Sequence, residues 1–166
     1  PIMEGKMIWV TSDLHFNHQK LIDNGVRPEN YEAKLIKQWN GTVRDGDIVI
    51  ILGDISWKDG YKKLEQLKGK KILVRGNHDY KSCETYMNDF AFACDSFTMD
   101  YKGTNILFTH QPVIHVNADL NIHGHLHGRT NYEKKKHYLI SLENMGYGVF
   151  SLPAIVKDWK RKNGLK

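Results

Sequence analysis

Three apolar, β-branched segments in the first half of the chain each end abruptly in polar residues. They are MIWVTSD (7–13), DIVIILGD (47–54) and KILVRGNHD (71–79). Continuous apolar runs of this length, bounded by polar residues and glycine, predict buried strands. Each predicted strand therefore ends at a cluster of acidic or amide side chains.

Amphipathic segments separate these predicted strands. In residues 30–43, Asn30 as an N-cap, apolar residues at helical spacing and Gly41 as a stop predict a helix. Residues 60–69 have leucines bounded by glycines and predict a second helix. Apolar strands that alternate with amphipathic helices predict a sheet that is parallel in its first half and covered on both faces.

The second half of the chain has shorter apolar segments. Two β-like runs around a Lys-Gly pair predict a hairpin over residues 97–110, and residues 119–125 and 136–144 predict further short strands. Residues 153–162 begin with a proline and have apolar residues at helical spacing, which predicts a closing helix. The whole pattern predicts an α/β protein.

Composition adds few constraints. With 166 residues, 40% of them hydrophobic, the chain is long enough for one globular domain over residues 1–166 with its own core. The sequence has neither a membrane-spanning apolar stretch nor a signal peptide, so we expect a cytoplasmic protein with no membrane partner. Cys83 and Cys94 belong to no CxxC pair and are expected to be reduced thiols.

The net charge of +5 is compatible with a polyanionic partner, but the lysines are spread out. The one tight run is EKKKH (133–137), which we interpret as a solvated turn in preference to a nucleic-acid contact. Charge alone therefore leaves the question of nucleic-acid binding open.

Candidate chemistry lies at the ends of the predicted strands, where ligands bind in open α/β sheets. The residues there are carboxylates, imidazoles and one amide, and this donor set suits Mn, Fe, Zn, Ni or Mg better than Cu(I) or an iron–sulfur cluster. Each cluster alone is also explained by a turn or a cap, but five clusters in succession favour a metal site. In chain order they are Asp13 and His15; Asp54; Asn77, His78 and Asp79; His110; and His125 and His127.

The ordered pattern DxH, GD, GNHD, H and GHxH resembles that of the calcineurin-like metallophosphoesterases. It runs from Asp13 to His127, and SDLHFNH (12–18) is most similar to a branch of small, stand-alone bacterial and phage phosphoesterases. The resemblance implies a fold of two facing mixed β-sheets flanked by helices. The short spacers leave little room for a cap domain, so we expect none.

The resemblance also implies a cage for two divalent metal ions, with Mn²⁺ expected and Fe, Zn, Ni or Mg as alternatives. Asp54 would bridge the ions, and the cage would stay near +2, so that it attracts a phosphate and ionises a bridging water for attack on the P–O bond. One ion would take Asp13, His15, Asp54 and His127, and the other Asp54, Asn77, His110 and His125.

Further roles follow by the same resemblance. His78 would protonate the leaving oxygen as general acid, with Asp79 holding its other ring nitrogen. His18 would contact the substrate or a carboxylate that supports the metal ligands without binding the metal itself, and Asn77 would also face the substrate. Other residues are expected to be structural: His123 in a strand, His115 and His137 on the surface, and Trp9, Trp39, Trp57 and Trp159 in the core.

The function expected from this pattern is a dinuclear-metal phosphoesterase that hydrolyses P–O bonds with a metal-bridging hydroxide. An open site, His78 and a mildly basic charge favour a phosphodiesterase acting on small cyclic or linear nucleotides. The alternatives are a phosphomonoesterase, a nuclease acting on DNA or RNA, and a non-catalytic binding scaffold on the same fold. The sequence indicates neither the oligomeric state nor the natural substrate.

Overall fold

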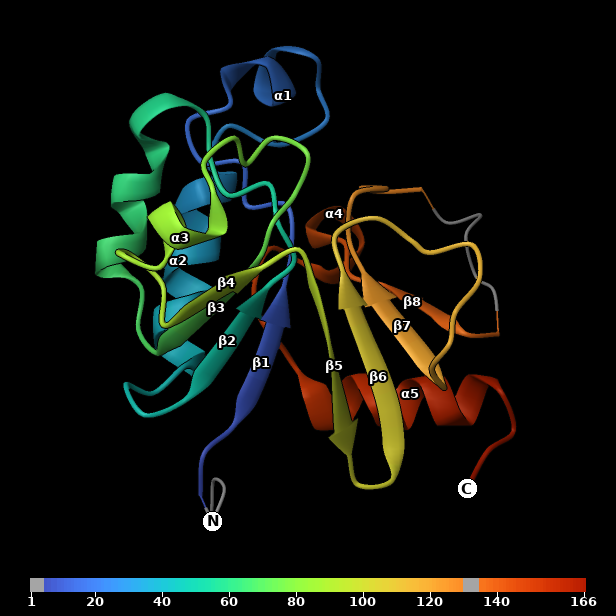
Figure 1. Ribbon diagram of the computed structural model, residues 1–166. Coiled ribbons are helices and arrows are strands. Elements are labelled where there is room, and N and C mark those ends of the chain that lie inside the picture. The colour runs from blue at the N-terminus through green and yellow to red at the C-terminus, as the bar shows by residue number, and fades with distance from the viewer. Residues whose placement is uncertain (1–4, 130–134) are drawn as a thin grey trace.

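The computed structural model describes residues 5–129 and 135–166 of the chain. Within these residues two β-sheets face each other (Figure 1), with strand orders β4-β3-β2-β1-β9 and β5-β6-β7-β8. Mixed sheets flanked by helices are the fold that the resemblance predicts. The strands are β1 Ile8–Thr11, β2 Ile48–Ile51, β3 Lys70–Val74, β4 Phe92–Cys94, β5 Ser96–Tyr101, β6 Thr104–Thr109, β7 Leu120–His123, β8 His137–Leu139 and β9 Phe150–Ser151.

The first sheet confirms the predicted parallel arrangement. Strands β1 to β4 pair in parallel, and β9 adds an antiparallel edge beside β1. Its inner face packs against the second sheet, so that Val10 and Ile50 share one buried cluster with Phe108 and Ile122. Parallel pairing places the carboxyl ends of β1, β2 and β3 at one edge.

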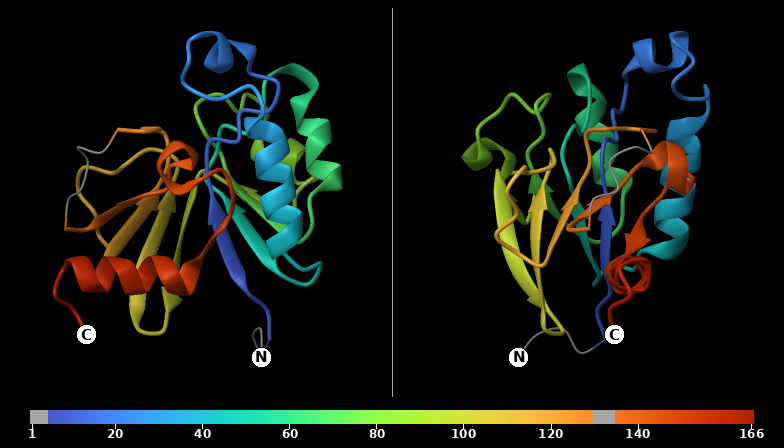
Figure 2. Two further views of the ribbon diagram at one scale, coloured as in Figure 1. Left: turned by 180° about the vertical axis from the view of Figure 1, so that it is seen from behind. Right: turned by 90° about the vertical axis from the view of Figure 1, so that its right-hand side faces the viewer.

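Helices cover the outer side of the first sheet and one side of the second (Figure 2). Trp39 of α2 packs on Val49 and Leu73 of the first sheet, and Trp159 of α5 joins the cluster between the sheets. The helices are α1 Gln19–Asp23, α2 Tyr31–Thr42, η1 Lys58–Gln66, α3 Cys83–Tyr86, α4 Leu142–Met145 and α5 Leu152–Lys162.

The predicted helix boundaries need two corrections. Helix α2 continues through Gly41 and ends where Val43 turns extended, because a single exposed glycine weakens a helix without terminating it. The segment 60–69 forms no α-helix: its residues 60–66 belong to the 3₁₀ helix η1, which begins at Lys58 and ends at Gln66.

In the second sheet the predicted hairpin is confirmed. β5 and β6 pair around Lys102 and Gly103, whose positive φ angles of 50° and 78° are those of a tight two-residue turn. The predicted strand over 136–144 is shorter than expected: β8 ends at Leu139, and Ser141 then caps α4 with its hydroxyl. This early turn brings α4 beside the carboxyl end of β7.

Three expectations about individual side chains need comment. Trp57 is 40% exposed and therefore not a core residue. His137 is buried instead of exposed, because its Nε2 donates a hydrogen bond to the Val113 carbonyl. Both cysteines, Cys83 and Cys94, are free thiols, as predicted.

The two remaining sequence features are membrane-spanning segments and the charged turn. In the described part of the chain, no helix is long and apolar enough to cross a bilayer. The predicted charged turn over 133–137 lies partly outside the described residues, and only its last residues, from Lys135 on, are placed.

Candidate metal centre

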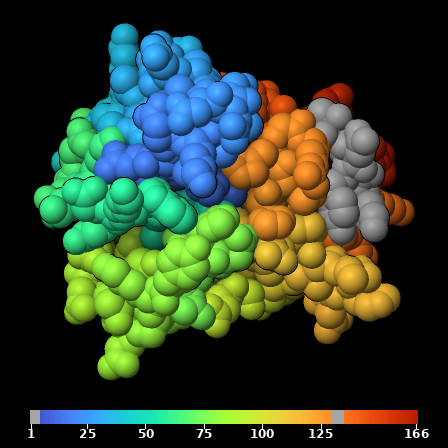
Figure 3. Space-filling view, turned by 90° about the horizontal axis from the view of Figure 1, so that it is seen from above, coloured from blue at the N-terminus to red at the C-terminus, as the bar shows by residue number. Residues whose placement is uncertain are grey.

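The carboxyl ends of the central strands of both sheets lie at the same edge of the molecule (Figure 1), and Figure 3 looks down on this face. Loops that follow β1 and β2 meet loops that follow β6 and β7 there, and two clusters of ligand-capable side chains result. Within each cluster, one ligand atom from every residue lies within 4.8 Å of the others. We call them the Asp13 group (Asp13, His15 and His127) and the Asp54 group (Asp54, His110 and His125).

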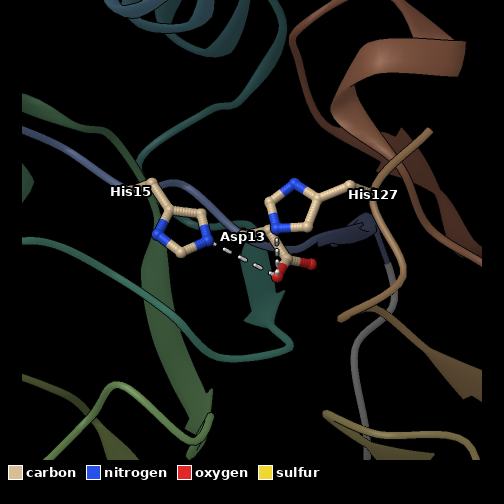
Figure 4. Close-up of side chains that lie close together, drawn as sticks. All are labelled: Asp13, His15 and His127. Carbon is tan, nitrogen blue, oxygen red and sulfur yellow. Dashed lines mark ion pairs between the residues drawn. The ribbon is translucent and has the colours of Figure 1, made fainter. Parts of the chain in front are cut away.

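In the Asp13 group, two imidazoles flank one carboxylate (Figure 4). Asp13 Oδ1 lies 3.8 Å from His15 Nε2 and 3.9 Å from His127 Nε2. Both Asp13 Oδ1 and His15 Nε2 are buried without a hydrogen-bond partner. Because buried polar atoms are nearly always paired, these two atoms mark a place that suits a bound cation.

The Asp54 group adjoins the first. Asp54 Oδ2 lies 3.4 Å from His110 Nε2 and 3.6 Å from His15 Nε2, so one carboxylate oxygen faces both groups. Asn77 Oδ1 lies 2.9 Å from His110 Nε2, and His125 Nδ1 lies 3.1 Å from the same nitrogen. All seven ligands that the resemblance implies thus come together.

The backbone of these loops is unusual. Five of the six residues in the two groups have a positive φ, a conformation that costs a non-glycine residue roughly 1–3 kcal/mol and that concentrates at functional sites. The angles are 53° at Asp13, 48° at His15, 53° at Asp54, 69° at His125 and 51° at His127. The surrounding packing must therefore hold the ligands in place.

Glycines allow part of this packing. A Cβ at Gly124 would collide with Ser12 Oγ and Asp13 Oδ2, so only glycine allows this loop to approach Asp13 so closely. At Gly128 the nearest atom would be 3.5 Å away, so that glycine is not sterically required. A Cβ at Gly53 would lie 2.5 Å from the Gly76 nitrogen and 2.7 Å from His110 Nδ1.

Hydrogen bonds orient the ligand imidazoles. His110 Nδ1 donates to the Leu52 carbonyl at 2.7 Å, and His127 Nδ1 donates to Glu143 Oε1 at 3.0 Å. These bonds place the ring proton on Nδ1 and leave Nε2 of each ring as the ligand atom, the usual arrangement around protein-bound metals.

Arg27 extends this arrangement beneath the Asp13 group. Its Nε donates to Glu143 Oε1 at 2.8 Å, and its terminal nitrogens donate to the carbonyls of Asp13 at 2.7 Å and Leu14 at 3.0 Å. Arg27 is only 2% exposed. Neither Arg27 nor Glu143 is recognisable as part of the site from the sequence, because nothing local in the chain distinguishes them from ordinary surface charges.

The carboxylate ligands are also oriented. Asp13 Oδ2 accepts from the Ser12 hydroxyl and from the backbone N–H of His125, which leaves Oδ1 facing the histidines. Asp54 Oδ1 accepts from the His78 backbone N–H at 2.9 Å, which leaves Oδ2 between the groups. Each aspartate therefore presents one oxygen to the candidate metal positions.

Asp79 does not hold the His78 ring, so that prediction is wrong. Its Oδ2 accepts from the backbone N–H groups of Asp54 and Gly76, and its Oδ1 accepts from that of Ile55. The buried Asp79 carboxylate lies between two loops and accepts hydrogen bonds from their main-chain N–H groups. Asp79 thus positions the Asp54 loop.

The two other predicted site histidines flank the Asp13 group. His78 Nδ1 lies 3.2 Å from the Tyr80 hydroxyl, and the His78 and His15 ring centroids are 5.9 Å apart. His18 Nδ1 lies 3.2 Å from His15 Nδ1, and its ring stacks on Trp57 at 5.3 Å. His18 therefore contacts the imidazole of the candidate ligand His15.

Burial dominates the electrostatics of the cluster. It lowers the pKa of His15 to about 2 and also lowers the pKa of His125, so both rings are neutral, the form that binds metals. It raises the pKa of Asp13. At His127 burial is again the largest cause and lowers the pKa, but the hydrogen bond to Glu143 and the negative charges of Asp13 and Glu143 together outweigh it, so the pKa is raised.

Neutral nitrogen ligands and oxygen ligands, without sulfur, are the donors that divalent ions of the Mn, Fe, Zn and Mg kind prefer. The unpaired atoms Asp13 Oδ1 and His15 Nε2 and the shared oxygen of Asp54 fit two such ions side by side. The residues present therefore suit a dinuclear centre.

Comparison with known proteins agrees with this geometry. The sequence profile of the calcineurin-like phosphoesterase superfamily domain matches residues 7–146. The chain therefore belongs to the calcineurin-like phosphoesterases, a superfamily of metal-dependent phosphoesterases, as its motifs predict.

Particular relatives are small proteins. The chain is 35% identical to an uncharacterised protein of Methanocaldococcus jannaschii, over 93% of this chain and 92% of the relative. A protein of unknown function from Aquifex aeolicus has a similar structure, with a TM-score of 0.79 and 27% identity over 92% of this chain and 99% of the other. A novel archaeal phosphodiesterase, 22% identical over 81% of each chain with a TM-score of 0.50, shares the fold.

Proposed function

We propose that this protein is a two-metal phosphoesterase that cleaves phosphodiester bonds in small nucleotides. The observation that carries the proposal is the position of Asp54 Oδ2, 3.6 Å from His15 Nε2 in one ligand group and 3.4 Å from His110 Nε2 in the other. A carboxylate oxygen shared by two ligand groups is what a bridged pair of divalent ions requires.

Two divalent ions, when bound, supply positive charge for the phosphate and acidify the attacking water. The protein's part is to hold them, with Mn²⁺ as the expected ion. One position is formed by Asp13, His15, Asp54 and His127, and the other by Asp54, Asn77, His110 and His125.

His78 is the proposed general acid. Its Nδ1 is engaged by the Tyr80 hydroxyl, which orients the ring and leaves Nε2 to donate a proton to the leaving oxygen. His18 and Asn77 lie beside the two ligand groups and are the proposed contacts to the rest of the ester. Asp79 acts indirectly, by anchoring the backbone of Asp54.

The charge pattern favours a diester. Arg27, the buried cation nearest the ligands, uses its donors on Glu143 and on two backbone carbonyls, so it does not clamp a phosphate. The phosphate would instead meet the metal ions and the flanking imidazoles of His18 and His78. This suits a diester, which carries one negative charge, better than a doubly charged monoester.

The test begins with protein stripped by chelator and reloaded with Mn²⁺. Initial rates on bis-p-nitrophenyl phosphate and p-nitrophenyl phosphate are compared for the wild type, Asp54→Asn and Asp45→Asn, a control at an exposed aspartate. We expect metal-dependent turnover, faster on the diester, that Asp54→Asn lowers at least 100-fold and Asp45→Asn leaves unchanged.

Metal content is measured on the same samples. A wild type that holds two Mn²⁺ ions but hydrolyses neither ester would contradict the enzymatic proposal and point to a binding scaffold. Faster turnover of the monoester would overturn the diester assignment alone.

A further inference from the structure

A cavity of about 360 Å³ lies beside the metal centre, between residues 55–64 and residues 78–90. Figure 3 shows the hollow between these teal and green segments. Ile55 and Leu64 contribute aliphatic side chains to its lining, and the remaining lining includes an unusual number of rings. These are Trp57, Tyr61, Tyr80, Tyr86 and Phe90, together with His78.

The cavity is continuous with the candidate active site. His78 lines it, and the His78 ring centroid is 5.9 Å from that of the ligand His15. Trp57 lines it as well and stacks on His18, whose Nδ1 lies 3.2 Å from His15 Nδ1. A group attached to a phosphate at the metal centre would therefore reach the cavity directly.

Two of the lining rings are left uncovered. Trp57 is 40% exposed and Tyr80 is 76% exposed, whereas Tyr86 and Phe90, deeper in the cavity, are buried. An apolar cavity with buried rings inside and free rings at its rim suits a flat aromatic ligand, which gains by stacking on such surfaces.

Polar groups in the cavity narrow the choice of ligand. Lys81 Nζ lies over the Tyr61 ring, 4.5 Å from its centroid, and Lys58 also lines the cavity. An ammonium group held among rings can donate to the nitrogen and oxygen acceptors of a heterocycle, which a plain hydrocarbon ring lacks.

We propose that this cavity binds the nucleobase of the ester that the metal centre hydrolyses, an inference that rests on the proposed function. The base would stack against Trp57 and accept hydrogen bonds from Lys81, while its phosphate reaches the two ligand groups. The cavity would thereby select nucleotide esters over simple phosphodiesters.

The experiment measures binding by calorimetry to the Mn²⁺-loaded protein, with adenosine 5′-monophosphate, phenyl phosphate and ribose 5-phosphate as probes. We expect the nucleotide to bind at least tenfold tighter than ribose 5-phosphate, since stacking of a base on one aromatic side chain is worth about this much or more. Trp57→Ala should remove this preference without weakening ribose 5-phosphate, and Trp57→Phe should restore most of it.

Lys81→Met tests the donor. It keeps the length of the side chain, so phenyl phosphate should bind as before while the nucleotide loses several-fold in affinity. If phenyl phosphate already equals the nucleotide in the wild type, the cavity accepts any aromatic ester and the nucleobase assignment is wrong.

Equal affinities for the nucleotide and ribose 5-phosphate, or a nucleotide preference that survives Trp57→Ala, would overturn the proposal. Affinity and turnover are measured in separate experiments, so the two proposals are tested separately. A protein that hydrolyses diesters but shows no preference refutes the cavity alone, and one that prefers the nucleotide without hydrolysing any ester refutes the proposed function alone.

Discussion

The Asp13 group and the Asp54 group are built from similar ligands but are oriented in different ways. In the Asp13 group, His127 donates to Glu143, which in turn accepts from the buried Arg27. In the Asp54 group, His110 donates to the backbone carbonyl of Leu52. One group thus depends on a chain of charged side chains and the other on the main chain.

This difference decides which substitutions can affect each group. The Glu143 carboxylate that orients His127 can be removed by a substitution. The support of the Asp13 group can therefore be tested without changing a ligand. A carbonyl cannot be replaced by substitution, so the support of His110 can be disturbed only through the packing that places it, above all at Gly53, in the loop after β2 beside the His110 ring. The predictions below exploit this contrast.

The largest effect is expected for Gly53→Ala. The added Cβ would lie 2.5 Å from the Gly76 nitrogen and 2.7 Å from His110 Nδ1, at a residue whose φ is +85°. Overpacking and backbone strain together should destabilise the protein by about 3 kcal/mol, and bound Mn²⁺ should fall from two ions to one. Thermal unfolding and metal analysis check both.

The control for that change is Gly41→Ala, at a helical glycine with open space around its Cβ position. It should leave metal binding unchanged and stabilise the protein by up to about 1 kcal/mol. Two bound ions in Gly53→Ala would mean that the Asp54 group tolerates displacement of His110.

A smaller and more selective effect is expected for Glu143→Gln. The variant keeps the shape of the side chain but removes the charge that His127 and Arg27 both contact. Mn²⁺ affinity at one of the two positions should fall 10- to 100-fold while the other is retained, as is typical when such a supporting carboxylate is lost. Calorimetric titration with Mn²⁺ resolves the two positions.

Glu84→Gln, at an exposed glutamate in α3, is the matched control and should bind both ions as the wild type does. Equal weakening at both positions in Glu143→Gln would show that the groups are coupled and not separately supported.

The smallest effect concerns acid stability. Burial would raise the pKa of Glu143, but hydrogen bonds from His127 and Arg27 lower it to about 2 from 4.5. A carboxyl whose pKa is depressed by folding stabilises the protein above pH 4.5, and this contribution is lost as the pH falls toward 2. The free energy of unfolding of metal-free wild type should therefore decrease more steeply than that of Glu143→Gln over this range.

Urea unfolding of both proteins at each pH measures the difference. Asp13, whose pKa burial raises, acts with the opposite sign in both proteins and cancels. Parallel pH profiles would contradict the role given to Glu143.

Much of the fold was predictable from the chain. The apolar runs at 7–13, 47–54 and 71–79 indicate strands because parallel strands buried on both faces are apolar along their whole length, and all three appear. The family motifs identified all seven candidate ligands, and the structure brings them together. Predictions failed where a short element depends on its neighbours: η1 is 3₁₀, β8 is cut short by α4, and the two-residue β9 exists only because β1 offers it an edge.

Some features of the site could not be predicted from any pattern in the sequence. Asp79 was predicted to be a partner for His78 because the two are adjacent in the chain. Consecutive side chains seldom face each other, however. The Asp79 carboxylate instead accepts hydrogen bonds from main-chain N–H groups of two loops. Trp57 looked like a core residue because it is apolar, yet it lies at the rim of a cavity.

By itself the sequence determined the order of the strands along the chain, the chemical identity of the ligands and their placement at strand ends, because these follow from local hydrophobicity and residue type. The tertiary structure decided which groups support those ligands. Arg27 and Glu143 are 116 residues apart, and Asp79 reaches Asp54 across two loops. Contacts of that kind depend on how the two sheets pack, and side-chain spacing along the chain carries no information about them.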